Sequence, residues 1–175
     1  MKNAILTLCL LAASCASTQR LHFVPAPHEL SLQPQENGAV IGRVYSTVVG
    51  AVRNEETGDW RLHLRMRVEN EDDAPLRVRP DSVRLLDSRL HAFGTVVPEP
   101  ALGTEIPPFT TRVFELYFPM PRSEPRVSRL ESVHLRYSIE HADGHAEVSA
   151  GFERWDESPV STGIRWSFGY TNYCW

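Results

Sequence analysis

The feature that most constrains the fold is an unbroken alternation of apolar and polar residues from Trp60 to Glu69. Successive side chains of a β-strand point to opposite faces, so this pattern predicts a strand with one buried and one solvated face. Residues 41–52 before it are rich in β-branched residues, and the polar stretch 54–59 between them has the composition of a hairpin loop. The sequence therefore predicts a β-hairpin. Its second strand is expected to bury Trp60, Leu62, Leu64, Met66 and Val68.

The same alternation returns in three later stretches. Residues 110–118 place several large apolar side chains on one face. Residues 133–140 and 146–152 alternate on either side of Asp143-Gly144. Asp-Gly between two alternating runs is the strongest short signal for a hairpin, so these two stretches are predicted to pair.

Prolines divide the predicted strands. Pro80 separates two short extended pieces, residues 76–79 and 82–87, so the chain there is expected to bend or to change sheet. Residues 98–110 and 119–129 hold several prolines each and are interpreted as long connecting loops. No stretch of the domain shows a convincing long 3.6-residue periodicity.

About seven strands joined by hairpins and two proline-rich crossings predict an all-β fold, an antiparallel immunoglobulin-like β-sandwich. The order of its pieces is similar to that of small immunoglobulin-like domains in bacterial lipoproteins of unknown function. The pieces that carry this resemblance are Val68-Glu69-Asn70 with its acidic turn, Val83 to Asp87, and Val113 to Leu116. The sandwich is assigned to residues 39–155, and residues 156–175 to an aromatic C-terminal tail or an added strand.

The first residues predict export. Lys2 and the apolar run from Ala4 to Ala13 have the organisation of a secretory signal peptide, and the run is shorter than the about 20 residues that a membrane helix needs. The end of the run, Leu10 to Cys15, resembles the lipid-attachment box of bacterial lipoproteins. The resemblance implies cleavage before Cys15 and acylation of its thiol. An ordinary secretory signal, which would leave a soluble protein, is the alternative.

Lipidation of Cys15 would anchor the chain in the cell envelope. Ala16 after the cysteine, in place of Asp, implies sorting to the outer membrane if the host is Gram-negative. Residues 1–14 are accordingly assigned to the signal peptide and residues 15–38 to a lipid-anchored tether, because prolines among polar residues are typical of an extended linker. A short edge strand over residues 30–32 is the alternative for that part of the tether.

The cysteines constrain disulfide bonding. Cys9 would leave with the signal peptide and Cys15 would be acylated, so Cys174 would remain alone. Three interpretations stay open for Cys174: a packed thiol, an intermolecular disulfide, or a bridge to Cys15 if that residue is not acylated.

Composition excludes several classes of function. The formal net charge of −4 argues against a dedicated nucleic-acid-binding protein. Lys2 is the only lysine, which excludes Schiff-base catalysis and a phosphate-loop lysine in the mature chain. A local arginine cluster is interpreted as a strand face with acidic partners on neighbouring strands, the alternative being a patch that faces anions or lipid headgroups. It consists of Arg61, Arg65, Arg67, Arg77 and Arg79.

No nucleophile elbow, zinc-helix motif, glycine-rich phosphate loop or calcium loop is found, so the chain is not expected to be an enzyme or to carry a cofactor. The best candidate for a metal site is the hairpin turn that holds His141, Asp143 and His145, since imidazole and carboxylate ligands suit zinc, copper or nickel. A plain polar turn is the simpler interpretation.

For the acidic residues 69–73, calcium binding is likewise the alternative to a solvated turn.

The leading hypothesis is a membrane-anchored, non-catalytic lipoprotein that contacts another envelope protein. Its C-terminal aromatic residues are the candidate interaction surface: Trp166, Phe168, Tyr170 and Trp175. A periplasmic ligand- or metal-binding protein is the second hypothesis. A small outer-membrane barrel is the third, although the prolines and the lipidated start argue against it.

Overall fold

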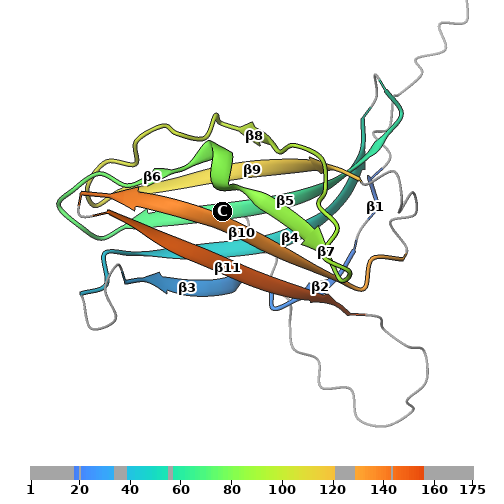
Figure 1. The fold of residues 1–175 in the computed structure, drawn as a ribbon, viewed down its shortest axis with the longest axis horizontal. Helices are drawn as coiled ribbons and strands as arrows, with labels where there is room; N and C mark the ends of the chain where they lie inside the picture. The colour runs from blue at the N-terminus through green and yellow to red at the C-terminus, as the bar shows by residue number, and fades with distance from the viewer. Residues whose placement is uncertain are drawn as a thin grey trace, which may run out of the picture.

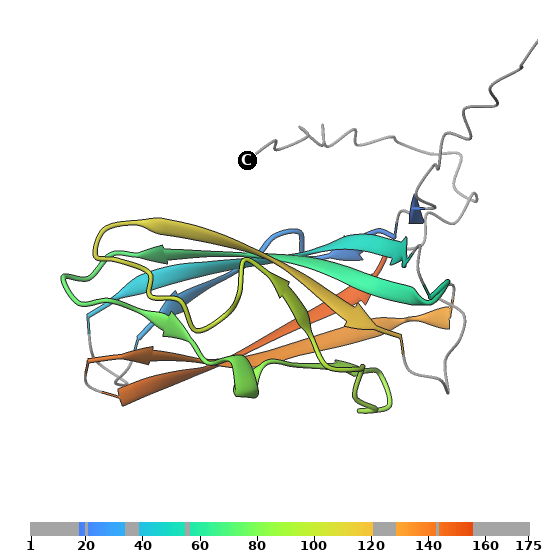
Figure 2. The same ribbon diagram turned by 90° about the horizontal axis from the view of Figure 1, so that it is seen from above.

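The protein is an antiparallel β-sandwich, as predicted, in which two sheets pack face to face (Figures 1 and 2). Within the described part of the chain there is no helix with the length and apolar character needed to cross a membrane. The computed structural model describes residues 18–19, 21–33, 39–54, 57–120, 129–142 and 144–155.

The first sheet is built on the predicted hairpin. The hairpin strands pair from Gly42 opposite Asn70 to Arg53 opposite Trp60, with a bulge between Val48 and Gly50. The order across the sheet is β1, β4, β5, β9 and β8, and β3 also pairs with β4. The strands are β1 (Thr18–Gln19), β3 (His28–Leu32), β4 (Gly42–Arg53), β5 (Trp60–Asn70), β8 (Val97–Glu99) and β9 (Thr111–Pro119).

The second sheet is built on the other predicted hairpin. Its two long strands pair along their whole length, from Ser132 opposite Glu153 to His141 opposite Gly144. The order is β2, β11, β10 and β6, and β7 pairs with β10 further along that strand. The strands are β2 (Phe23–Val24), β6 (Arg77–Val78), β7 (Arg84–Asp87), β10 (Ser132–His141) and β11 (Gly144–Arg154).

The core lies between the sheets and consists of their alternate side chains. Four of the five side chains predicted to be buried on β5 are buried, and Trp60, at the end of the strand, is partly buried against them. Tyr137 of β10 is fully buried, and its side chain forms a hydrogen bond with Ser46 of β4 in the opposite sheet. Burial raises the pKa of Tyr137, so its hydroxyl stays neutral.

The N-terminal part of the predicted tether is incorporated into the sandwich. The tether assignment of residues 15–38 is therefore wrong for residues 18–19 and 21–33, where β1 and β3 pair with β4 and β2 pairs with β11. Leu21, Phe23 and Leu32 are buried in the core, and their burial offsets the entropy lost when the segment is ordered. The prolines that suggested a linker, Pro25 and Pro27, lie where the chain crosses from one sheet to the other.

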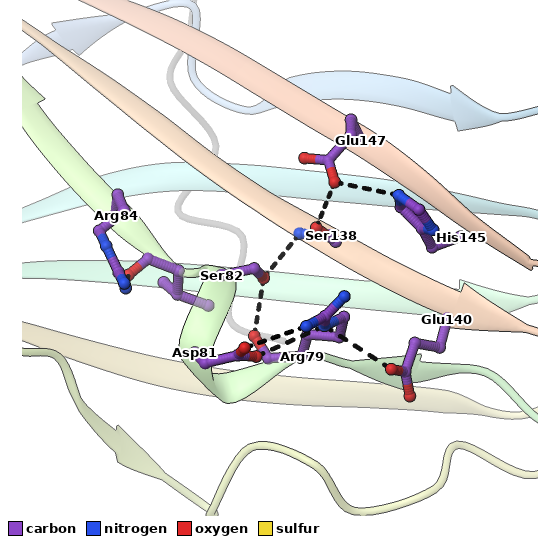
Figure 3. Close-up of polar contacts among 9 residues, drawn as sticks. Arg79, Asp81, Ser82, Arg84, Ser138, Glu140, His145 and Glu147 are labelled. Carbon is purple, nitrogen blue, oxygen red and sulfur yellow. Dashed lines mark hydrogen bonds and ion pairs between the residues drawn. The ribbon is translucent and has the colours of Figure 1, made fainter.

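The break at Pro80 bends the chain without moving it to the other sheet. Residues Pro80–Ser82 form a 3-10 turn, η1, and the strands on both sides of it pair with β10. At the break the Ser82 hydroxyl accepts a hydrogen bond from the Ser138 N–H (2.8 Å) and donates one to the Arg79 carbonyl (2.8 Å), as Figure 3 shows. The Ser82 hydroxyl therefore takes the place of the strand carbonyl that would otherwise accept from the Ser138 N–H.

The two ends of the sandwich differ in what they carry. The terminal end, on the right in Figures 1 and 2, holds β1, the end of β11 at Arg154 and the turn after β7. The opposite end, hereafter the Phe109 end, holds the end of β5 at Asn70, the loop before β9 and the tip of the β10–β11 hairpin.

The Ser82→Ala substitution tests the role assigned to this hydroxyl. It leaves the Ser138 N–H without its acceptor, so the free energy of unfolding should fall by about 1–3 kcal/mol. Urea denaturation followed by circular dichroism measures the change. Thr104→Ala removes an exposed hydroxyl bonded to the Ala101 carbonyl and should cost less than about 0.5 kcal/mol. Equal losses in the two variants would contradict this role.

Candidate functional site

The Phe109 end is organised by one buried amide side chain. Asn70 is the last residue of β5 and continues the inward-facing series of Leu64, Met66 and Val68. It is only 3% exposed, although it is polar. A buried amide is tolerated only when its hydrogen-bonding groups find partners, so the surrounding backbone has to supply them.

Backbone carbonyls supply the acceptors for the Asn70 amide. Its Nδ2 group donates to the carbonyl oxygens of Ala74 at 2.9 Å, Ile106 at 3.0 Å and Pro107 at 3.1 Å. Ala74 belongs to the acidic turn that follows β5, whereas Ile106 and Pro107 belong to the long loop before β9. One side chain therefore ties together two loops more than 30 residues apart in the sequence.

The remaining groups of Asn70 are also paired. Its Oδ1 atom accepts from the Asp72 N–H at 3.0 Å, and its own N–H donates to the Thr110 carbonyl at 2.8 Å. The Thr110 hydroxyl in turn donates to the Pro107 carbonyl at 2.7 Å. These bonds fix the loop on both sides of Phe109.

Phe109 is displayed by this loop in an unfavourable state. Its φ angle is +55°, in the left-handed region that a non-glycine residue rarely adopts, and its side chain is 72% exposed. A shallow hollow of about 310 Å³ lies beside the ring. The hollow is lined by Glu69, Asn70, Glu71, Phe109, Thr110 and Thr111.

The acidic residues beside the hollow are partly neutralised. Glu69 forms an ion pair with Arg67 at 3.1 Å, and Glu71 forms one with Arg43 at 3.2 Å. Asp73 lies exposed at the tip of the acidic turn. Among the described residues no group of three or more His, Cys, Asp or Glu side chains is placed to hold a metal ion. Two of these carboxylates, Glu69 and Glu71, therefore line the hollow beside the Phe109 ring, each with an arginine partner.

A second exposed apolar residue with left-handed backbone lies at the terminal end. Leu90, in the turn after β7, has a φ angle of +64° and is 66% exposed. The buried Asp87 side chain organises this turn by accepting from the N–H groups of Arg89 and His91, both at 2.8 Å. Burial alone would raise the pKa of Asp87, but these N–H groups and the His91 imidazole outweigh it and hold the pKa below its ordinary value.

Two of the three residues predicted for a metal site, His141 and His145, lie at the Phe109 end, on strands β10 and β11. His141 lies opposite Gly144, and His145 lies opposite Glu140. The His145 Nε2 atom lies 3.5 Å from the Glu147 Oε1 atom. Asp143 lies outside the described residues, so the predicted set of three ligands stays a prediction.

The polar cluster beside this hairpin joins a serine, a carboxylate and an imidazole (Figure 3). The Ser138 hydroxyl donates to the Glu147 Oε1 atom at 2.6 Å, and the His145 Nε2 atom lies 3.5 Å from the same oxygen. In a nucleophilic triad the imidazole lies between the hydroxyl and the carboxylate and takes the hydroxyl proton. Here the carboxylate occupies the middle position, so the arrangement does not activate Ser138 as a nucleophile.

The predicted arginine cluster is divided between the sheets, with Arg65 and Arg67 on β5 of the first and Arg77 on β6 of the second. The predicted acidic partner on a neighbouring strand is found for Arg65, whereas Arg67 pairs within its own strand and Arg77 with a loop residue. Arg65 pairs with Glu115 of the neighbouring strand at 2.7 Å, and Arg77 pairs with Glu105 at 2.8 Å. His63 also binds Glu115, at 2.6 Å, and stacks on the ring of Tyr117. Arg65, His63 and Glu115 therefore satisfy one another on the outer face of β5 and β9.

Sequence reasoning did not identify Asn70 and Phe109 as a site. One usable signal was present, because Asn70 occupies an inward position of the alternating strand, where a polar residue needs buried partners. Other predicted functional residues lie outside the described part of the chain. These are Cys15 and the aromatic residues Trp166, Phe168, Tyr170 and Trp175.

No protein-family model matches the chain, and neither a curated protein nor a solved structure matches it. Its function is therefore inferred from the chemistry of its own residues.

Asn70→Asp tests whether the side-chain amide holds the Phe109 end together. An ionised carboxylate cannot donate to the three carbonyl oxygens, so the free energy of unfolding at pH 7 should fall by about 2–4 kcal/mol. Asp73→Asn makes the reverse exchange at an exposed position and should change the free energy of unfolding by less than about 0.5 kcal/mol. Denaturant titration of both variants measures the two changes. If Asn70→Asp lowers the free energy of unfolding no more than Asp73→Asn does, the role assigned to the Asn70 amide is refuted.

Proposed function

We propose that this protein is a lipid-anchored, non-catalytic component of the cell envelope that uses its Phe109 end to bind another envelope protein. The observation that carries this proposal is the display of Phe109, an exposed aromatic ring on a left-handed backbone. The lipid anchor is supported by the resemblance of Leu10 to Cys15 to a lipoprotein attachment box.

The conformation of Phe109 is costly and its ring stabilises little in the isolated domain. The left-handed backbone costs a non-glycine residue about 1–2 kcal/mol. An exposed ring contributes little of the about 1.5–3 kcal/mol that burial of a large apolar side chain supplies. Glycine at this position would remove the backbone cost. Strain of this kind persists mainly at functional sites, where the surrounding structure enforces it.

The backbone that carries the ring is also held in place, which favours binding. Asn70 and Thr110 fix the backbone on both sides of Phe109, so little further loop ordering is required when a partner binds. Aromatic side chains that enter a partner's pocket are typical energetic centres of protein interfaces.

The surroundings of Phe109 indicate the chemistry of the partner. Glu71 lines the hollow, and Asp73 lies exposed two residues further along the acidic turn. Opposite charges at the rim of an interface speed association and set its orientation. The partner surface is therefore inferred to be an apolar pocket with a basic rim.

Phe109→Gly and Phe109→Ala test this function, with Leu90→Ala as the matched control because Leu90 shares the exposure and the positive φ angle. Each tagged variant is used as bait in detergent-solubilised envelope, and the captured proteins are compared by quantitative mass spectrometry. We expect at least one protein to be retained by wild type and Leu90→Ala and reduced about tenfold or more by both Phe109 variants, since an interface centre contributes about 2 kcal/mol or more.

The thermal midpoint of Phe109→Gly separates loss of binding from loss of folding. Because glycine tolerates the positive φ angle, this variant should unfold at or above the wild-type temperature. A folded Phe109→Gly protein that captures the same proteins as wild type in the same amounts would refute the proposed function.

A further inference from the structure

We propose that the terminal end of the sandwich rests on the lipid surface, with Leu90 and Trp155 in the headgroup region, so that the Phe109 end points away from the membrane. This orientation depends on the proposed lipid anchor at Cys15. It adds a second interaction surface whose partner is a bilayer.

The first support is the length of chain between the anchor and the fold. Only Ala16 and Ser17 separate Cys15 from Thr18, the first residue of β1. Consecutive Cα atoms are about 3.8 Å apart, so three steps span at most about 11 Å. Thr18 pairs with Val52 near the end of β4, which fixes it at the terminal end of the sandwich. An anchored Cys15 therefore keeps this end close to the bilayer.

The second support is the pair of exposed apolar side chains at the same end. Leu90 is 66% exposed, and Trp155, directly after β11, is 56% exposed. Tryptophan combines an apolar ring with a polar N–H group and is enriched where proteins meet lipid headgroups. Leucine on a projecting turn gains by leaving water for the acyl boundary.

Both side chains extend from well-anchored backbone. The Asp87 carboxylate holds the turn around Leu90, and the Trp155 N–H donates to the His22 carbonyl at 2.7 Å. β7 and β11 pair with opposite edges of β10, with Asp87 and Phe152 both opposite Val133. Leu90 and Trp155 are therefore two separate projections from one end, and a deformable lipid surface can receive both without a complementary pocket.

The length of the strands then determines where the partner site lies. β5 has 11 residues and runs from Trp60 at the terminal end to Asn70 at the Phe109 end. At about 3.3 Å per residue it separates the two ends by about 35 Å. Phe109 is consequently held far enough from the membrane to meet the exposed part of another envelope protein.

Fluorescence quenching in reconstituted vesicles tests the orientation. The full-length lipoprotein is purified in a Cys174→Ser background with one new exposed cysteine, Ser88→Cys at the terminal end or Asp73→Cys at the Phe109 end. Each cysteine is labelled with the fluorophore NBD, and the protein is inserted into phosphatidylethanolamine–phosphatidylglycerol vesicles that contain nitroxide-labelled lipid. We expect the label at residue 88 to be quenched at least threefold more than the label at residue 73.

A substitution in the proposed contact provides the second measurement. Leu90→Asp, combined with Ser88→Cys, should reduce the quenching at residue 88 by half or more while circular dichroism remains unchanged. The matched control Phe109→Asp, in the same background, should leave this quenching unaltered. Equal quenching at residues 88 and 73, stronger quenching at residue 73, or no effect of Leu90→Asp would overturn the proposed orientation.

Failure of the anchor is distinguished from failure of the orientation by two further steps. The intact mass of each preparation shows whether Cys15 is acylated, and an unmodified Cys15 would refute the anchor in the proposed function. Residues 16–175 are then held on nickel-chelating lipid through an N-terminal histidine tag, and the same two labels are compared. Stronger quenching at residue 88 supports the lipid-facing surface without the native anchor, and equal quenching refutes it.

Discussion

The Phe109 end of the molecule depends on one interaction, the buried amide of Asn70 with the backbone of two loops. Strand β5 could end in an apolar residue and bury the same surface, but an apolar side chain could not satisfy the carbonyl oxygens of Ile106 and Pro107. The amide compensates for its burial by fixing the crossing loop against the acidic turn. The position of Phe109 follows from that fixed loop.

The turn at the terminal end is likewise fixed by one buried polar side chain, a carboxylate instead of an amide. The Asp87 carboxylate is buried at the end of β7 and holds the turn that displays Leu90, as Asn70 holds the loop that displays Phe109. The two displayed residues share a left-handed backbone and high exposure, yet they lie at opposite ends of the sandwich. Only the terminal end is connected to Cys15 by a short chain, so the two surfaces are assigned different partners, a bilayer and a protein.

Much of the fold was predictable because strand periodicity is a local property. The alternation from Trp60 to Glu69 identified β5 and its buried face, and Asp143-Gly144 identified the β10–β11 hairpin. Of the N-terminal strands, only part of β3 was considered, as an alternative to a linker, because β2 and β3 are short and adjoin prolines. Their apolar residues gain stability only through partners distant in the sequence. The site was missed for the same reason. The hydrogen bonds of Asn70 and the φ angle of Phe109 arise from tertiary contacts that no local pattern encodes.

Site-specific photo-cross-linking in living cells tests most directly whether the two ends face different partners. A benzophenone-bearing phenylalanine analogue replaces Phe109 in one strain and Leu90 in another, because both side chains are exposed and both positions carry a positive φ angle. The account predicts discrete protein adducts from position 109, and adducts with lipid but no discrete protein adduct from position 90. Protein adducts from position 90 together with none from position 109 would contradict it.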